Sequence, residues 1–396
     1  MYPKIVTPLP HPEDVQFLKR LEHFEPKSMQ NQLPIVWDRA VDSLVYDRWG
    51  NVFIDFTSTI CVTNAGHGNP DICNAIRKTL NKPLLHSYNF ATEIRLEYLQ
   101  ALTRHTGYEK AFLTSAGTEA TEIACKIMRL ATNRPYIISL TGAMHGKTML
   151  AEQLKGVEDW CGKGEIIHLD FPPNSCILAQ SIKSIPLSKI AGIILESYRG
   201  WNAEFFSSHF IQKLVRFCLE HDILVCFDEI QSGFGRTGKF FAFEHYNVRP
   251  DLVCCGKGLG GGVPISAVLG DKELLDVPED LSSTNSANPL VCSAGLANLN
   301  FLKKNNIIEQ VAEKGKLLEK GLKNIGYPYN CKGLVGAIIT ETANEATDIV
   351  QRCFQKGLLL IWTHRNSIKI APPLTISARQ LKRGLEILRE ECVRCS

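Results

Sequence analysis

Short apolar runs alternate with amphipathic helical patterns from about residue 110 onward, and this alternation restricts the possible folds more than any other feature of the chain. Two of the intervening segments, 119–131 and 207–221, predict helices, and Ile123, Ile127 and Leu130 share one face of the first. Strands that alternate with helices usually pair in parallel and are covered by those helices. We therefore expect an α/β fold with a mostly parallel, helix-covered sheet. The predicted strands are Ala111–Leu113, Tyr136–Leu140, Gly192–Leu195, Ile223–Phe227, Leu252–Cys255 and Ile265–Leu269.

After about residue 295 the pattern changes to long amphipathic helices around short strands, which indicates a second, smaller α+β domain. Near the other end, residues 44–55 predict a hairpin whose turn lies at 49–51, whereas residues 1–40 are punctuated by proline and predict irregular chain. The elements predicted after residue 290 are helices at about 292–304, 307–325, 344–356 and 378–394 and strands at Ala337–Thr340, Leu358–Trp362 and Ile368–Ile370.

The length of 396 residues accommodates one large and one smaller domain. We expect residues 1–55 to be the N-terminal segment of the small domain, 56–294 to form the large domain, and 295–396 to complete the small domain.

The composition argues against several classes of protein. A net charge of +3 without a run of basic residues gives no sign of nucleic-acid binding. No apolar run approaches the length of a membrane span, and the N-terminal residues lack the apolar core of a signal peptide. The fourteen cysteines form no regular framework, and Cys392 and Cys395 make a single CxxC without a second pair. We expect a cytoplasmic protein with reduced thiols and no metal.

A lysine within a glycine-rich stretch, Lys257 in 256–262, follows the predicted strand Leu252–Cys255. Asp228, 29 residues earlier, closes an apolar strand. A lysine exposed on such a turn suits Schiff-base chemistry, and a carboxylate at a strand end suits the pyridinium nitrogen of pyridoxal phosphate. Each residue taken alone also has an ordinary alternative: a solvated loop lysine, and an aspartate that caps the next turn.

Two polar turns suit a phosphate group. In Thr114–Ala120 a predicted strand passes through Gly117 into a helix, whose first N–H groups and dipole favour an anion. Thr284, in the polar turn 283–289, precedes the helix predicted near 292 and could donate its hydroxyl. A purely structural turn and a plain helix cap remain the alternatives for these two segments.

Taken together, these elements resemble the class-III aminotransferases, pyridoxal-phosphate enzymes of fold type I, over about residues 40–380. The most specific matches are Asp228–Gly238 and Gly256–Gly258 with the glycines that follow. The other similar segments are Thr63–His67, Gly117–Ala120, His145–Thr148, Asn288–Pro289 and Ala371–Leu374.

The resemblance implies a homodimer with shared active sites. It makes Lys257 the Schiff-base lysine and proton carrier, and Asp228 the partner of the ring nitrogen. It places Glu196 and Lys369 on the substrate side. Further cofactor contacts are implied for Gly117, Thr118, Met144, His145, Ile230 and Gln231, and for Thr284 from the second subunit.

Five positions depart from the family pattern. Met144 stands where a ring-stacking tyrosine or phenylalanine is usual, and Lys369 stands where many members use an arginine that grips a carboxylate in a planar fork. Ala116 replaces a serine and Ser197 a proline, while Trp201 stands where some members carry a gating glutamate. Lys369 either binds the substrate carboxylate less tightly or indicates a substrate that is not held as a standard amino acid.

The expected activity is transfer of an amino group from a primary amine or amino acid, not at an α-carbon, to a keto acid such as 2-oxoglutarate or pyruvate. A racemase or an aminomutase of the glutamate-1-semialdehyde type would use the same residues, and decarboxylases and lyases share the scaffold. A non-catalytic protein derived from the fold is the remaining alternative, and the presence of both Lys257 and Asp228 argues against it.

Overall fold

The computed structural model describes residues 2–30, 32–157, 160–162, 164–170 and 185–393. The chain separates into two compact units. Unit 1 comprises residues 1–69, 201–203 and 309–396, and unit 2 comprises residues 70–200 and 204–308.

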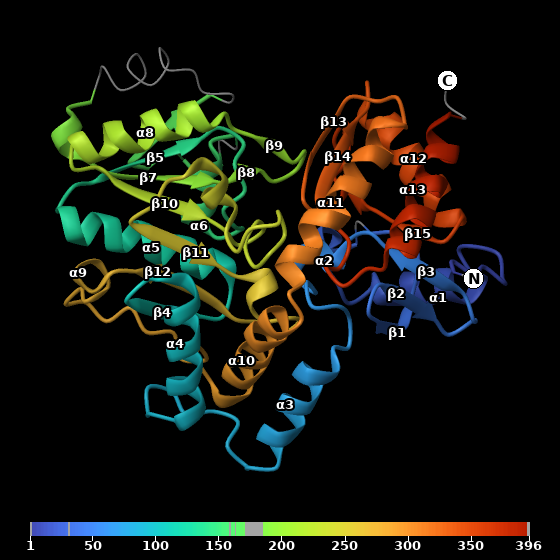
Figure 1. The fold of residues 1–396 in the computed structure, drawn as a ribbon, viewed down its shortest axis with the longest axis horizontal. Coiled ribbons are helices and arrows are strands. Elements are labelled where there is room, and N and C mark those ends of the chain that lie inside the picture. Colours follow the sequence, from blue (N-terminus) through green and yellow to red (C-terminus); the bar gives the residue numbers. More distant parts are fainter. Residues whose placement is uncertain (1, 31, 158–159, 163, 171–184, 394–396) are drawn as a thin grey trace. The chain divides into compact units, whose positions relative to one another are not determined.

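The described part of unit 2 is built on a seven-stranded sheet, in the order β4-β12-β11-β10-β7-β5-β6 (Figure 1). Neighbours from β11 to β6 pair in parallel, whereas β12 runs antiparallel to both β11 and β4. The mostly parallel α/β fold is therefore confirmed, with one reversed strand. The strands are β4 (Lys110–Thr114), β5 (Tyr136–Leu140), β6 (Ile166–Leu169), β7 (Ile190–Glu196), β10 (Leu224–Asp228), β11 (Leu252–Cys255) and β12 (Ser266–Gly270).

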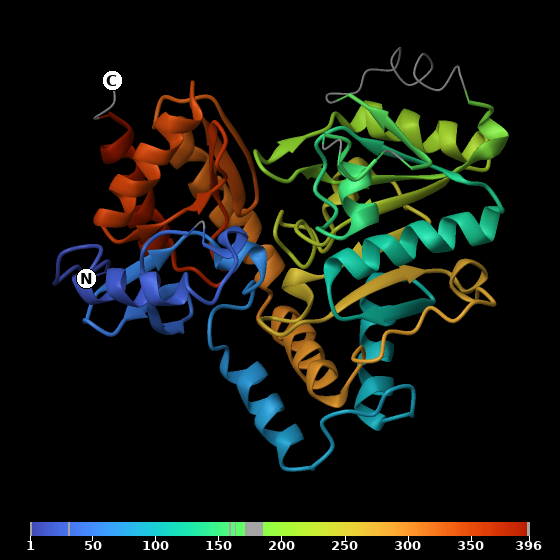
Figure 2. The ribbon, with the colours of Figure 1, turned by 180° about the vertical axis from the view of Figure 1, so that it is seen from behind.

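Helix α5 (Gly117–Thr132) packs along the sheet and is seen in full in Figure 2. Its buried positions include Ala120, Ala124 and Ile127, which join the core that the strands build, while Ile123 and Leu130 are half-buried. Helices α6 (Met149–Lys155) and α8 (Ser208–Glu220) pack against β5 and β10. With helices against it, the sheet has strands that are apolar on both faces, and every residue of β7 is buried.

Three further helices of unit 2 pack together, since α10 (Pro289–Lys304) lies against α3 (Pro70–Leu80) and α4 (Glu93–Thr106). The start of α10 was predicted near 292 but lies at Pro289, because the Asn288 side chain accepts a hydrogen bond from Val291 N at 3.1 Å. The short elements of unit 2 are β8 (Tyr198–Arg199), β9 (Glu204–Phe205), α9 (Lys272–Leu275) and the 3₁₀ turns η2 (Leu187–Lys189), η3 (Ala242–Tyr246) and η4 (Lys257–Leu259).

Unit 1 contains two four-stranded sheets in its described residues, in the orders β1-β2-β3-β15 and β13-β14-β17-β16. Helix α12 (Ala343–Gln355) packs against α13 (Ala378–Val393) and β15, and the stacked rings of Phe53 and Phe354 lie in the core of this region. Helix α11 (Ile307–Lys323) precedes β13. The strands are β1 (Trp37–Val41), β2 (Leu44–Asp47), β3 (Val52–Asp55), β13 (Tyr329–Lys332), β14 (Val335–Ile339), β15 (Leu358–Leu359), β16 (Ile361–Trp362) and β17 (Ser367–Ile370).

Two predictions for unit 1 are wrong. Residues 1–40 are not irregular throughout: they contain the turn η1 (Lys27–Met29), most of β1 and the helix α1 (Pro12–Leu21), whose first turn is capped by the His11 ring accepting from Glu13 N. The run Leu358–Trp362 is two strands rather than one, because β15 pairs with β3 and β16 pairs with β17. The predicted hairpin at 44–55 is confirmed by β2 and β3.

The segment α2 (Ser58–Cys61) is a left-handed turn, in which four successive non-glycine residues have φ between 47° and 65°. In the described part of the chain, no helix has the length and hydrophobicity to span a membrane. None of the described cysteines forms a disulfide, and Cys395 of the predicted CxxC lies outside the described residues.

Candidate active site

Three predicted residues stand at the carboxyl ends of neighbouring strands in unit 2. Asp228 ends β10 and lies in register with Glu196, which ends the parallel strand β7. On the other side, Asp228 is in register with Cys254 of β11, and Lys257 follows three residues later. Because ligands of open α/β sheets bind beyond this edge, the register gathers two carboxylates and an amine where a ligand would bind.

Asp228 is buried and both of its carboxylate oxygens have partners. Oδ2 lies 2.8 Å from His145 Nδ1, and Oδ1 accepts from Ile230 N at 3.0 Å. The second ring nitrogen of His145, Nε2, is buried without a hydrogen-bond partner among the described residues. Asp228 thus caps the following turn, as the ordinary alternative supposed, and also forms a buried pair with a histidine.

Lys257 begins η4 and is half-buried, and its backbone has a φ of +37°. Few non-glycine residues adopt such a conformation, and when they do it is often at functional sites. The turn is held by Asn298 of α10, whose Nδ2 donates to Gly258 O at 2.8 Å and to Leu259 O at 2.9 Å. The lysine therefore lies on a fixed, strained turn rather than on a loose loop.

Ile230 joins the lysine turn to the start of α5. A Cβ atom added at Gly117 would lie 3.0 Å from Ile230 Cδ1, and one added at Gly256 would lie 3.2 Å from Ile230 Cγ2. The two glycines therefore let their backbones approach the isoleucine closely, and Ile230 forms an apolar wall between the two turns.

The predicted phosphate turn leads into α5 at Gly117, and the first N–H groups of a helix have no partner within the helix. Thr118 Oγ1 lies 2.6 Å from Thr148 Oγ1, and Thr121 Oγ1 donates to His145 O at 2.8 Å. These bonds tie the start of α5 to the loop that carries Met144 and His145. The turn, Asp228 and Ile230 therefore belong to one connected group.

Met144, Glu196 and Gln231 lie at the edge of this group. Met144 N donates to Glu196 Oε2 at 3.1 Å, and the Met144 side chain is 41% exposed. A Cβ added at Gly200 would contact Glu196 Oε1 and would lie 3.4 Å from the Gln231 amide, so Glu196 and Gln231 are close to the same backbone position.

The two remaining predicted residues are Thr284 and Lys369. Thr284 is exposed in its turn, and its carbonyl oxygen lies 2.8 Å from His86 Nε2. Lys369 belongs to unit 1, where it is 2% exposed on β17 between β14 and β16.

Two polar residues that support the group, Glu229 and Asn298, are not among the residues predicted from the sequence. Glu229 is fully buried, and burial raises its pKa to about 7 although four hydrogen bonds act to lower it. Its signal was an acidic pair, Asp228-Glu229, directly after an apolar strand. Asn298 could have been recognised as a polar amide within the largely apolar sequence of helix α10.

The described residues fit pyridoxal phosphate. Asp228 offers a buried carboxylate for a ring nitrogen, Lys257 an amine, and the start of α5 a place for a phosphate. Gly117 and Gly256 leave room beside the apolar wall of Ile230, against which a flat ring would pack.

Comparison with known proteins decides the family, since a sequence model of the class-III aminotransferases matches residues 26–391. The chain belongs to the class-III aminotransferases. It is therefore a pyridoxal-phosphate-dependent transaminase.

Similar curated enzymes cover nearly the whole class-III aminotransferase chain. The 5-aminovalerate aminotransferase of Pseudomonas aeruginosa is 34% identical over 94% of this chain and 97% of its own length. The acetylornithine aminotransferase of Caldanaerobacter subterraneus is 31% identical over 90% and 94%. An ornithine aminotransferase of Staphylococcus aureus is 33% identical over 90% and 94%.

Solved structures agree with the fold of this class-III aminotransferase. Acetylornithine aminotransferase from Elizabethkingia anophelis has a TM-score of 0.85 at 27% identity and covers 96% of this chain and 99% of that one. Ornithine aminotransferase from Toxoplasma gondii has a TM-score of 0.90 at 22% identity, over 99% and 96%. The second likeness concerns the fold alone.

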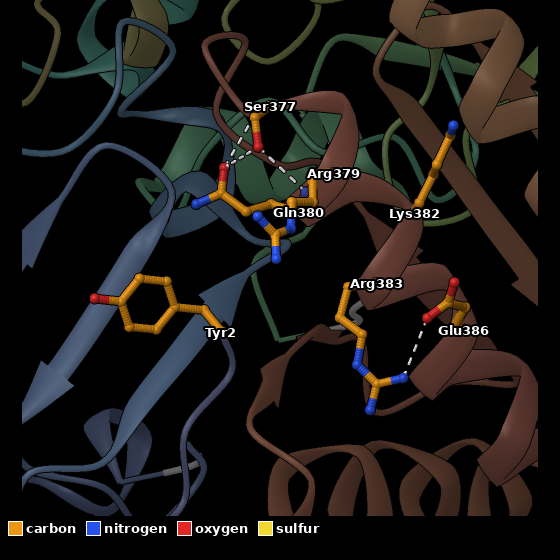
Figure 3. A pocket seen from close by; sticks show the side chains of 7 residues that line it. All are labelled: Tyr2, Ser377, Arg379, Gln380, Lys382, Arg383 and Glu386. Atoms are coloured by element: carbon orange, nitrogen blue, oxygen red, sulfur yellow. Dashed lines mark hydrogen bonds and ion pairs between the residues drawn. The ribbon is translucent and has the colours of Figure 1, made fainter.

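A cavity of about 570 Å³ in unit 1 contains none of the predicted site residues (Figure 3). Cationic side chains of α13 dominate its lining, and Arg383 pairs with Glu386 at 3.2 Å. Its lining residues are Tyr2, Ser377, Arg379, Gln380, Lys382, Arg383 and Glu386. Its lysine and carboxylate, Lys382 and Glu386, are exposed on one helix, whereas Asp228 is buried at a strand end.

Proposed function

We propose that this aminotransferase takes the amino group of an ω-type amine, one distal to the α-carbon, and passes it to a keto acid such as 2-oxoglutarate or pyruvate. The names of its relatives support the donor class. One acts on 5-aminovalerate, whose amine lies at the end opposite its carboxylate, and others act on ornithine and acetylornithine.

The proposal rests on one observation: Asp228 and Lys257 stand at the carboxyl ends of two adjacent strands. Bound pyridoxal phosphate supplies an aldehyde and an electron-withdrawing ring. Asp228 keeps the ring nitrogen protonated, and its burial strengthens that interaction. Lys257 would hold the aldehyde end of the bound cofactor through Nζ, and the same amine, when free, would accept a proton from the substrate carbon and later return it.

The remaining residues bind and orient. Gly117 and Thr118 hold the phosphate, and Thr284 of a second copy completes that site. Ile230 and Met144 cover the two faces of the ring. Gln231 contacts the ring hydroxyl, and His145 contacts Asp228. Glu196 and Lys369 face the substrate. The closeness of Ile230 to both glycine turns and of His145 to Asp228 supports this arrangement.

We also propose a homodimer in the cytoplasm. Five large apolar side chains in 80–96 are 47–77% exposed: Leu80, Leu84, Leu85, Phe90 and Leu96. So many exposed apolar residues in one segment are typical of an interaction surface. Light scattering on the purified protein should give twice the chain mass, and a monomer at micromolar concentration would contradict the dimer.

Absorption spectra test the activity. Protein purified with pyridoxal phosphate is treated in turn with L-glutamate, L-alanine, 5-aminovalerate and terminal diamines. A donor should abolish the cofactor band, and a keto acid should restore it. Lys257→Ala should bind the cofactor without covalent attachment and turn over nothing. Substrate consumption without any need for a keto acid would instead favour a racemase or an aminomutase.

A further inference from the structure

A fully buried carboxylate beside the candidate site holds three separate segments together. Glu229 accepts hydrogen bonds from Ser197 Oγ, from Ser232 Oγ at 2.7 Å, and from Ala242 N and Phe243 N at 2.9 Å each. The two backbone donors go to different oxygens, Oε2 and Oε1. The carboxylate therefore uses both oxygens to fix a loop, a strand end and the start of η3.

The segments that Glu229 joins are the ones that carry the predicted site residues. Ser197 directly follows Glu196 at the end of β7, and Glu229 directly follows Asp228 at the end of β10. Tyr246, which ends η3, donates its hydroxyl to Ser197 O at 2.5 Å. The ends of two sheet strands and η3 are thus linked by one set of buried hydrogen bonds.

The same bonds confine Ile230 and Gln231. These two residues lie between Glu229 and Ser232, so the carboxylate and the Ser232 hydroxyl anchor the short loop at both of its ends. Ile230 in turn lies against Gly117 and Gly256, the phosphate turn and the lysine turn. A shift of this loop would therefore move the wall on which the ring of the cofactor packs.

We propose that Glu229 is a positioning residue for pyridoxal phosphate, which orients the cofactor ring by fixing the loop of Ile230 and Gln231, and that the Ser197 hydroxyl belongs to this anchor. The inference rests on the placement of the cofactor against Ile230 in the proposed function. Ser197 stands where the family usually has proline, which has no hydroxyl, so this donor is a feature of the present chain.

The variant Glu229→Gln tests the role. Glutamine keeps the shape but turns an N–H₂ group toward one of the two backbone N–H donors, so the loop must rearrange. Apoprotein titrated with pyridoxal phosphate should bind the cofactor about tenfold or more weakly, the size expected when a buried backbone donor is left without an acceptor. The visible circular dichroism per bound cofactor, which reports ring orientation, should also change.

Glu244→Gln is the matched control. Glu244 Oε1 accepts from Phe241 N at 2.7 Å at the same helix start, but no described hydrogen bond joins it to Ser197 or Ser232. This variant should keep the cofactor affinity within about twofold and the dichroism of the wild type. Ser197→Ala removes one of the four donors to Glu229 and is a milder variant in case Glu229→Gln does not fold. It should bind pyridoxal phosphate about threefold to tenfold more weakly than wild type.

The outcomes separate the two proposals. Folded Glu229→Gln or Ser197→Ala protein with wild-type affinity and dichroism, even at a lower melting temperature, would show a purely structural role and overturn this inference alone. Wild-type protein that binds pyridoxal phosphate without a covalent bond to Lys257 would overturn the proposed chemistry of the site instead. Wild-type protein that binds none would overturn both.

Discussion

His145 Nδ1 and Asp228 Oδ2 lie 2.8 Å apart, and both side chains are buried at the carboxyl edge of the sheet. If the imidazole of His145 carries its proton on Nδ1, it donates to the carboxylate and holds it in a fixed orientation. In the proposed role Asp228 holds a proton on the ring nitrogen of the cofactor, and Asp228→Asn removes the charge that does so. We expect kcat/KM to fall by about 10²–10³-fold at saturating cofactor.

The control for this prediction is His145→Gln, which can still donate to Asp228 and should lose far less activity than Asp228→Asn. Transamination rates of the three proteins at one pH give the comparison. Equal losses for both variants would mean that the histidine does more than orient the carboxylate.

The contact of Ile230 with Gly117 predicts a steric coupling. In Gly117→Ala the new Cβ would lie 3.0 Å from two Ile230 atoms, and Ile230 has little room to move because it also lies close to the Gly256 backbone. We expect the variant to lose about 1–3 kcal/mol of unfolding free energy. Ile230→Val alone should cost about 0.5–1.5 kcal/mol, and the double variant should be more stable than the sum of the single effects. Urea unfolding of the apoproteins measures all four, and strict additivity would contradict the contact.

Glu229 should make stability depend on pH in the direction opposite to a salt-bridged carboxylate. Burial raises its pKa from an ordinary 4.5 to about 7, so the folded protein favours the protonated form. The stabilising contribution of Glu229 to the free energy of unfolding is complete below pH 4.5 and is lost as pH rises through 7. Neighbouring Tyr246 and Cys255, whose pKa values burial raises, stay neutral in this range.

The measurement is a difference between two proteins. Between pH 4.5 and 8, wild type should lose about 3 kcal/mol of unfolding free energy relative to Glu229→Gln, since each pKa unit corresponds to about 1.4 kcal/mol. Because other titrating groups are common to both proteins, they cancel in the comparison. A pH-independent difference would show that Glu229 keeps one protonation state throughout.

Much of the sheet and the central pair of residues follow from local sequence. Leu252–Cys255 is a continuous apolar run bounded by polar and glycine residues, which is what a strand covered on both faces requires. Asp228 and Lys257 follow such runs at the expected spacing. The reversed direction of β12 has no comparable signal, because an apolar strand reads alike in a parallel and an antiparallel pair.

The residues that hold the site in place could not be predicted from the sequence, because their contacts join residues far apart in the chain. Asn298 reaches Gly258 across 40 residues, and Ser197 reaches Glu229 across 32. The left-handed turn α2 is equally hidden, since it contains no glycine. It is held from afar by Ser58 Oγ donating to Ala371 O at 2.5 Å, across 313 residues.

This left-handed turn predicts a stabilising substitution. Thr59 has φ 49° and ψ 48°, a conformation that costs a non-glycine residue about 1–2 kcal/mol and glycine almost nothing. Thr59→Gly should raise the free energy of unfolding by about 0.5–1 kcal/mol after the extra chain entropy of glycine is subtracted. Thr57→Gly should instead lower it by about 1 kcal/mol, because Thr57 Oγ1 bonds Asp55 Oδ1 and Thr59 N. Loss of stability in Thr59→Gly would show that the threonine contributes contacts worth more than the strain.

Lys369 predicts how the enzyme distinguishes its donors. If its ammonium group binds the substrate carboxylate as a point charge, Lys369→Met should raise KM for 5-aminovalerate by about tenfold to hundredfold. Donors without a carboxylate, such as terminal diamines, should change less than about threefold, because they make no such contact.

Lys369→Arg is the informative companion variant, since arginine restores the planar fork that many family members use. It should remain active with carboxylate donors, and its KM for them should stay below that of Lys369→Met. Lys369 is 2% exposed on β17, so thermal unfolding of each variant is measured as a check on whether the substitution disturbs packing. Equal losses of kcat with carboxylate donors and diamines would assign Lys369 to the structure of unit 1 and remove it from substrate recognition.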